Sequence, residues 1–188
     1  MLQGGKEGGP TALREAPPAE ATRVLMPSPI GRLGIEFRGQ AVARLVIQPS
    51  AAEAKHFKSL HEVELTDFLT EAIGRLSEYF AGVRVDPAIE VDLAANELDD
   101  FAVRVLTEVC RIPYGKTWTY KKLSEASGRR EAHSQVRRIL ATNPIPVLVP
   151  CHRVVPERGG AGAWIGGTRK KEKLLRIERR ASAPLKAV

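Results

Sequence analysis

Residues 144–155 read Pro-Ile-Pro-Val-Leu-Val-Pro-Cys-His-Arg-Val-Val, an apolar run bounded by prolines that leads into a cysteine, a histidine and an arginine. The apolar run predicts a stiff, mostly buried segment with Cys151 at its end. A cysteine is a strong nucleophile as the thiolate, and nearby cationic or proton-accepting groups lower the pKa of the thiol. The stretch therefore predicts a site built around one reactive sulfur.

His152 follows Cys151 directly, and one water between the two side chains is enough to carry away the thiol proton. A histidine in this role needs a partner on its other ring nitrogen, usually a carboxylate. Glu178 is the candidate, because it lies one helical turn beyond Leu174 and Leu175 and shares their inward face. The alternative is a surface glutamate on a frayed helix end.

The composition is that of a soluble globular protein. The chain has 188 residues, of which 43% are hydrophobic and 27% are charged, enough for one or two small domains. No apolar stretch approaches the roughly 20 residues of a membrane span, and the N-terminus lacks a signal-peptide pattern. We therefore expect no membrane association. Two cysteines do not make a disulfide framework, so we also expect a reducing compartment.

Charge is distributed unevenly along the chain. Residues 1–110 contain 11 Lys and Arg against 17 Asp and Glu, a net charge of −6, whereas residues 111–188 contain 18 against 5, a net charge of +13. This asymmetry favours a polyanion such as nucleic acid as the partner of the C-terminal half. The alternative is a basic surface that only keeps the protein in solution.

Composition and periodicity predict a disordered tail at 1–22, an N-terminal α/β domain at 23–95, a C-terminal domain at 96–180 and a short tail at 181–188. Nothing in the first domain indicates a site. The sequence contains no internal repeat.

The first domain is predicted to contain a hairpin and one long helix. Residues 30–37 and 41–47 are two strands joined by a short turn. Apolar residues at helical spacing predict a helix over 67–81, closed by Gly82.

The second domain is predicted to be helical, with helices at about 98–111, 119–127 and 131–141 and a last one from 168. Gly128 fits the left-handed position after the second helix. Two short helices joined by a glycine-containing turn are typical of a helix-turn-helix, in which the second helix reads DNA. Many helical hairpins share this pattern, and the basic charge of this half is what favours DNA binding.

Cys110 follows Val109 on an apolar helix, which predicts a role in core packing. The two cysteines and the scattered His56, His61 and His133 show no metal-ligand spacing, so we expect neither a metal nor a cofactor.

Several segments together resemble the O6-alkylguanine-DNA alkyltransferase family over roughly residues 24–180. The most specific is Asn143-Pro-Ile-Pro-Val-Leu-Val-Pro-Cys-His-Arg-Val-Val155, which resembles the active-site signature of the family. The other similar segments are Pro27–Gly31, Leu76–Gly82, Ile112–Tyr120, Ala163–Gly167, and Lys171 with Leu174, Leu175 and Glu178.

The resemblance implies an α/β (α+β) fold, with a small ribonuclease-H-like N-terminal domain and a C-terminal helical domain that contains a winged helix-turn-helix. It implies stoichiometric, irreversible transfer of the alkyl group from O6-alkylguanine in double-stranded DNA to Cys151, without a cofactor. O4-alkylthymine is left open as a second substrate. The DNA would be bound through its minor groove, with the damaged guanine flipped into a pocket. A monomer is expected, in the cytoplasm or nucleoid of a prokaryote or in the nucleus of a eukaryote.

The resemblance also assigns catalytic roles. Cys151 would attack the alkyl carbon, and Tyr120 would donate a proton toward guanine N3. His152, a water and Glu178 would keep the sulfur deprotonated. Asn143 would tie the helix-turn-helix to the active-site segment.

Other residues would bind the substrate or support the pocket. The backbone carbonyls of Val149 and Cys151 would accept from the amino group of the base. Trp164 would form an aromatic wall, and Ile165 would offer bulk and a backbone N–H to O6. Arg153 is assigned to structure beneath the pocket.

The recognition helix departs from the family pattern, which places an arginine early in this helix to fill the gap left by the flipped base. Ser134 stands at that position here, beside Gln135 as a further substrate-binding residue. Serine is too small for the gap, so we expect that Arg137 or Arg130 substitutes, or that flipping is weaker. DNA contacts are expected mostly at phosphates, with salt-sensitive affinity.

Three alternatives belong to other functional classes. An alkyltransferase-like protein would bind the lesion without transfer, but such proteins lack the cysteine found here at Cys151. A transcription factor with Cys151 as an alkylation sensor would need a separate regulatory module. A thiol hydrolase would need an oxyanion hole and would turn over repeatedly.

Overall fold

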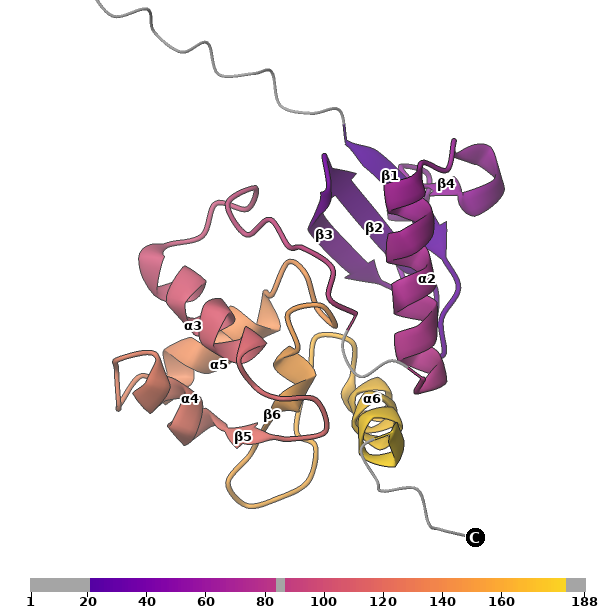
Figure 1. The fold of residues 1–188 in the computed structure, drawn as a ribbon. Coiled ribbons are helices and arrows are strands. Elements are labelled where there is room, and N and C mark those ends of the chain that lie inside the picture. The colour runs from indigo at the N-terminus through magenta and orange to yellow at the C-terminus, as the bar shows by residue number, and fades with distance from the viewer. Residues whose placement is uncertain (1–20, 84–86, 182–188) are drawn as a thin grey trace, which may run out of the picture.

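The protein is described by a computed structural model covering residues 21–83 and 87–181. The N-terminal part is a four-stranded sheet in the order β3-β2-β1-β4 (Figure 1). β1 and β2 are antiparallel, as are β2 and β3, whereas β4 is parallel to β1. The strands are β1 (Thr22–Met26), β2 (Leu33–Arg38), β3 (Ala41–Ile47) and β4 (Lys58–Ser59).

The predicted hairpin is confirmed, since β2 and β3 pair across a short turn in which Gly39 has a φ of 56°. The prediction of a tail at 1–22 falls mostly outside the described residues. The predicted end of this tail at residue 22 is wrong, because Thr22 begins β1 and pairs with Phe37. Two short helical segments flank β4: α1 (Ala51–Ala54) and a 3₁₀ turn (Leu60–Glu62).

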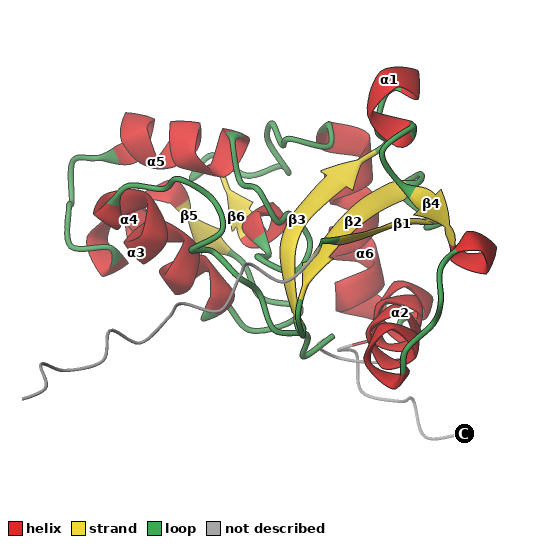
Figure 2. Ribbon diagram, turned by 90° about the horizontal axis from the view of Figure 1, so that it is seen from above, coloured by secondary structure: helices red, strands yellow, loops and turns green. Residues whose placement is uncertain are grey.

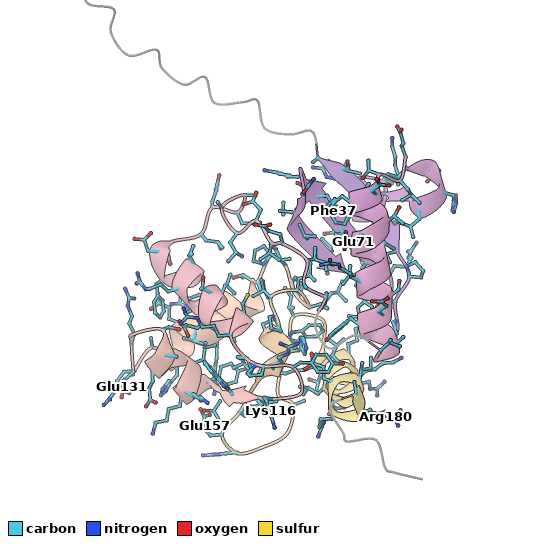
Figure 3. All side chains as sticks on the ribbon, viewed as in Figure 1. Phe37, Glu71, Lys116, Glu131, Glu157 and Arg180 are labelled. Atoms are coloured by element: carbon cyan, nitrogen blue, oxygen red, sulfur yellow. The ribbon has the colours of Figure 1, made fainter. Side chains whose placement is uncertain are left out.

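Helix α2 (Asp67–Ala81) covers one face of the sheet (Figures 1 and 2). The helix begins where Thr66 accepts a hydrogen bond from Leu69 N and ends where Gly82 adopts a φ of 72°, as predicted. Phe37 lies between sheet and helix (Figure 3), with its ring edge-on to Phe68 of α2. This packing forms the N-terminal core.

The C-terminal part is mainly helical, as predicted. Thr119 caps α4 by accepting from Lys122 N, and Gly128 has a φ of 82° in the turn between α4 and α5, which pack against each other. Asp99 caps α3 through Ala102 N. The elements are α3 (Asp100–Cys110), β5 (Trp118–Thr119), α4 (Tyr120–Ala126), α5 (His133–Ala141), a 3₁₀ turn (Cys151–Arg153), β6 (Val154–Val155) and α6 (Thr168–Ala181).

The predicted role of Cys110 in core packing is wrong, because its side chain is exposed. It is the last residue of α3 and lies about 100° around the helix axis from the buried Val109. The ribonuclease-H-like and winged labels, and the division at residues 95 and 96, stay predictions.

The two parts meet at the active-site segment. Leu45 N on β3 donates to Pro144 O at 2.9 Å, and α6 packs beside the end of α2 (Figure 1). In the described ranges no helix is both long and apolar enough to cross a membrane.

Candidate active site

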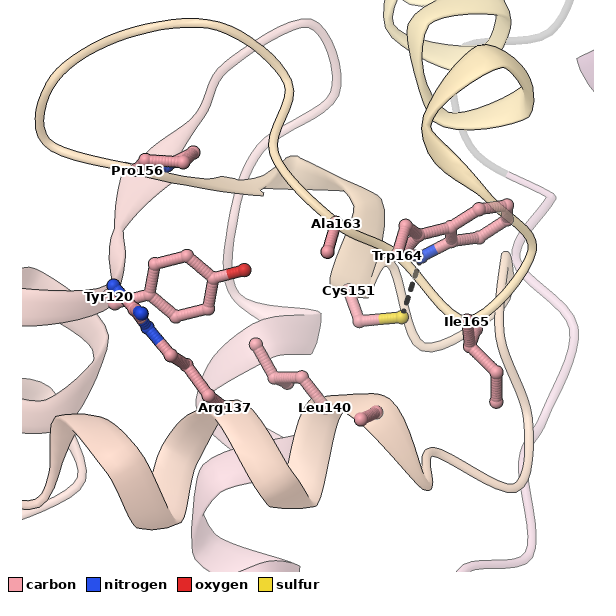
Figure 4. Close-up of a pocket in the computed structure, with 9 residues that line it drawn as sticks. Tyr120, Arg137, Leu140, Cys151, Pro156, Ala163, Trp164 and Ile165 are labelled. Atoms are coloured by element: carbon pink, nitrogen blue, oxygen red, sulfur yellow. Dashed lines mark hydrogen bonds between the residues drawn. The ribbon is translucent and has the colours of Figure 1, made fainter.

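Cys151 lies at the start of the 3₁₀ turn and its side chain is buried, with 1% of its surface exposed. Two N–H groups point at its sulfur. Asn143 Nδ2 and Trp164 Nε1 each lie 3.1 Å from Cys151 Sγ, and the indole contact is drawn in Figure 4. The surroundings therefore stabilise negative charge on the sulfur.

Asn143 holds the segment that leads to the cysteine. Its Nδ2 also donates to Val149 O at 3.0 Å, and its Oδ1 accepts from Ile145 N at 3.0 Å. Val147, between these partners, has a φ of 79°, which is rare for a β-branched residue. The side chain of Asn143 thus fixes an unusual backbone path and contacts the sulfur as well.

The carbonyl of Val149 was expected to accept from the amino group of the base. In this structure it already accepts from Asn143 Nδ2 and, at 2.7 Å, from Cys151 N. A carbonyl oxygen has two lone pairs. A bound base would therefore have to share or displace one of these two donors.

Glu178, on α6, is fully buried and collects hydrogen bonds from four other groups. His152 Nε2 lies 2.7 Å from Oε1, and the Nε of Arg153 lies 3.0 Å from Oε2. The other donors are Gly115 N at 3.0 Å and the Tyr79 hydroxyl at 2.8 Å. The alternative of an exposed glutamate on a frayed helix end is therefore wrong.

Arg153 is buried and connects three elements. It binds Glu178 on α6 and, through Nη1, donates to Ile112 O at 2.7 Å, just after α3. The guanidinium also lies 5.5 Å from the ring centre of Tyr114. This position fits the structural role predicted for it.

These contacts fix the protonation of the pair formed by His152 and Glu178. Burial raises the pKa of Glu178, but hydrogen bonds and charges from His152 and Arg153 outweigh it and lower the pKa to about 2. The carboxylate is therefore ionised, and His152 Nε2 carries the proton that it shares with Oε1. Burial lowers the pKa of His152, so the ring is neutral near pH 7. Its Nδ1 is the unprotonated nitrogen; it is buried and has no hydrogen-bond partner among the described residues.

The expectation of a lowered pKa for Cys151 is not met in the resting site, because burial outweighs the neighbouring groups. Burial raises the pKa of the thiol, although the donors on Asn143 and Trp164 and the charge of Lys171 act in the opposite direction. His152 does not help in this state because it is neutral. The sulfur therefore rests as the thiol.

A cavity of about 520 Å³ opens beside Cys151 (Figure 4), within the size range of small-molecule sites. Trp164 and Ile165 line one side of it, and Tyr120 and Arg137 line the other. The Tyr120 hydroxyl points into the cavity from the side opposite Trp164 (Figure 4). The structure thus brings the predicted nucleophile, proton donor and pocket wall to one cavity.

The residues predicted on the recognition helix do not all reach this cavity. Arg137 lines it, with its guanidinium 4.8 Å from the ring centre of Tyr120. Ser134 and Arg130 are exposed and do not line it, and the half-buried Gln135 accepts from Arg129 at 3.3 Å. Of these four side chains, Arg137 is therefore the one that lies beside the cavity.

Sequence reasoning missed one residue near the site and gave no role to another. Tyr79 comes from α2, in the part where no site was expected, and it resembled an ordinary core aromatic. Lys171 was noted only within the family resemblance. It is fully buried, and its Nζ donates to Val154 O at 2.6 Å and Ala163 O at 3.4 Å. It thereby joins the strand after Cys151 to the loop that carries Trp164.

Within the described residues, no group of three or more His, Cys, Asp and Glu side chains could hold a metal ion. The expectation of a site without metal or cofactor stays a prediction.

Comparison with known proteins gives consistent results. Residues 100–180 match the family model of the 6-O-methylguanine DNA methyltransferase DNA-binding domain. The chain is 34% identical to the methylated-DNA–protein-cysteine methyltransferase of Mycobacterium leprae over 154 residues, 82% of this chain and 90% of the relative. It is 30% identical to the inducible methylated-DNA–protein-cysteine methyltransferase of Bacillus subtilis over 131 residues, 70% of this chain and 72% of the relative.

Solved structures agree with these relatives. The O6-methylguanine methyltransferase of Mycobacterium tuberculosis superposes with a TM-score of 0.74 at 29% identity, over 88% of this chain and 96% of that one. A structure of M. tuberculosis OGT in complex with DNA gives a TM-score of 0.73 at 29% identity, over 87% and 96%.

Proposed function

The chain belongs to the 6-O-methylguanine DNA methyltransferase family, and from this premise we propose that Cys151 accepts the methyl group. The protein repairs methylated DNA by direct reversal as a methylated-DNA–protein-cysteine methyltransferase. One observation carries the assignment. Cys151 Sγ lies beside the cavity and receives two N–H donors, from Asn143 and Trp164, at 3.1 Å each.

The transfer is a displacement at the methyl carbon of O6-methylguanine. A bond forms between Cys151 Sγ and this carbon while the carbon–O6 bond breaks, and its electron pair passes into the guanine ring. The leaving guanine needs a proton, which Tyr120 donates toward N3. The thioether that forms is stable, so each protein molecule reacts once.

The thiol must lose its proton as the attack begins. Its proton passes through one water to His152 Nδ1, the unprotonated nitrogen of that ring. The imidazolium that results is stabilised by Glu178, 2.7 Å from Nε2. Because burial raises the pKa of the thiol, the thiolate exists mainly during the reaction, stabilised by Asn143, Trp164 and the Lys171 charge.

Duplex DNA is the partner, bound through its minor groove by α4 and α5 with the damaged base flipped into the cavity. The net charge of +13 over residues 111–188 supports binding to phosphates. Arg137 fills the gap that the base leaves in the duplex, and its position on α5 beside the cavity supports this role. We assign the exposed Arg130 and Ser134 to the surface that faces the phosphate backbone of the DNA.

The protein acts as a monomer where the DNA lies, which is the cytoplasm or nucleoid of a prokaryote or the nucleus of a eukaryote. The bacterial and archaeal relatives support the prokaryotic setting. The alternative of a lesion-binding protein without transfer is not favoured, because Cys151 and both of its donors are present.

Intact-protein mass spectrometry tests the assignment. The protein is incubated with duplex DNA that carries one O6-methylguanine, and Cys151→Ala and Cys110→Ala are treated in parallel. We expect the mass of one methylene to be gained by the parent and by Cys110→Ala, stopping at one per molecule, and not by Cys151→Ala. A mass gain in Cys151→Ala would show that another residue accepts the methyl group. Binding to the lesion without any mass gain would favour the lesion-binding alternative.

A further inference from the structure

Helix α2 contributes a side chain to the hydrogen-bond network behind the cysteine. Tyr79 is fully buried, its hydroxyl donates to Glu178 Oε1 at 2.8 Å, and its oxygen lies 3.3 Å from His152 Nε2. It is separated from His152 by 73 positions and from Glu178 by 99. The contact therefore exists only when the N-terminal part is folded against the C-terminal part.

The direction of each hydrogen bond follows from the chemistry of the groups. The ionised Glu178 can only accept, so the Tyr79 hydrogen points to Oε1. His152 Nε2 carries its own hydrogen and shares it between Glu178 Oε1 and the Tyr79 oxygen. Tyr79 therefore holds the carboxylate and the imidazole in one arrangement, with Nδ1 left as the base.

We propose that Tyr79 is a positioning residue for methyl transfer, whose hydroxyl fixes the Glu178 carboxylate against His152 Nε2. The inference rests on the proposed function, because it concerns the base of that reaction. It gives the N-terminal part a direct role in the chemistry besides its role as a support.

The proposal has an electrostatic consequence. The Tyr79 hydroxyl neutralises part of the Glu178 charge, so its removal exposes His152 to more negative charge and raises the pKa of the imidazole. The other charged groups that act on this pair are Arg153, on both residues, and Lys171, on His152. A substitution of Tyr79 leaves all of these in place.

Tyr79→Phe in the full-length chain is the test, because it retains the ring that packs edge-on against Phe80 and Tyr114. Phe80→Leu is the matched control. It loosens the same turn of α2, but its side chain has no polar group to contact Glu178. Single-turnover methyl transfer is followed from acid to alkaline pH, and the pKa of His152 is measured by NMR in each protein.

We expect Tyr79→Phe to transfer about tenfold more slowly at neutral pH, the loss typical of one hydrogen bond to a charged group. The acid limb of its rate profile and the pKa of His152 should both move up by about half a pH unit. Phe80→Leu should keep the profile of the parent. A Tyr79→Phe profile equal to that of the parent, or a loss of rate shared with Phe80→Leu without a change in pH dependence, would overturn the proposal.

The two proposals fail in distinguishable ways. If the parent transfers no methyl group, the proposed acceptor chemistry fails, whereas the NMR titration of His152 still shows whether the Tyr79 hydroxyl lowers the pKa of the imidazole.

Discussion

The indole nitrogen of Trp164 lies 3.1 Å from Cys151 Sγ and donates its hydrogen to the sulfur. The contact spans 13 positions and fixes the loop before α6 against Cys151. The aromatic wall expected at this position therefore also acts as a hydrogen-bond donor to the proposed methyl acceptor.

Trp164→Phe tests this second role, because phenylalanine keeps an aromatic wall but has no N–H. The thiolate loses one of its two donors, so we expect transfer to slow by about tenfold. The rate is measured in single-turnover reactions with O6-methylguanine DNA. Trp118→Phe is the control, since Trp118 lies on β5 against Lys122 and does not line the cavity. Equal rates for Trp164→Phe and the parent would contradict the donor role.

Asn143→Ala removes three hydrogen bonds, to Cys151 Sγ, Val149 O and Ile145 N. Because Ile145 N is left buried without this partner and Val149 O keeps only Cys151 N as a donor, we expect the free energy of unfolding to fall by about 2–4 kcal/mol. Transfer should slow as well. Urea unfolding and transfer rates are measured together.

The control for this variant is Asn96→Ala, which removes side-chain hydrogen bonds to Ala43 O and Asp92 O and none to the sulfur. It should lose stability and keep its rate. If both variants lost stability but neither lost rate, the contact between Asn143 and the sulfur would have no catalytic role.

Lys171 gives a prediction about pH. Burial lowers its pKa from 10.5 to about 8. Between these values the unfolded chain keeps a proton that the folded protein has released, so the Lys171 contribution to stability rises with pH. We expect a gain of about 2 kcal/mol between pH 8 and pH 10 in the parent relative to Lys171→Met.

The measurement is urea unfolding of the parent and Lys171→Met at both pH values, with the exposed Lys173→Met as control. Lys173→Met should follow the parent. A pH dependence in Lys171→Met identical to that of the parent would show that the pKa of Lys171 is not lowered in the folded state.

The arginines near the cavity make a prediction about duplex DNA. If Arg137 fills the gap left by the flipped base, Arg137→Ala should repair a duplex about tenfold more slowly while its rate on single-stranded DNA changes little. Arg130→Ala should weaken binding to both and flatten the salt dependence. Rates are compared on the two substrates at two salt concentrations. If both variants repaired duplex DNA at the rate of the parent, neither arginine would take the role of the arginine that the family places where Ser134 stands here.

The elements that the sequence predicted well are those with local signals. Helix α2 was predicted to the residue from its apolar spacing and from Gly82 at its end, and α4 to within a residue at each end from Thr119 and Gly128. Strands β4, β5 and β6 are two residues long and depend on partners distant in the chain, so no local pattern marks them.

The same distinction holds for the site. Cys151, His152 and Glu178 were predicted from a motif and from helical spacing. The hydroxyl of Tyr79 could not be, because its partner lies 99 positions away. The raised pKa of the thiol also escaped prediction, since it depends on burial from all sides more than on sequence neighbours.

The depth of Cys151 has a consequence for the lifetime of the protein. A sulfur with 1% of its surface exposed, held mainly as the thiol, is shielded from peroxide and from disulfide exchange with small thiols. Under the proposed mechanism each copy reacts only once, so any oxidised copy would be lost to repair. Burial keeps idle copies competent until a damaged base arrives, and the number of lesions that a cell can correct then follows the number of copies it holds.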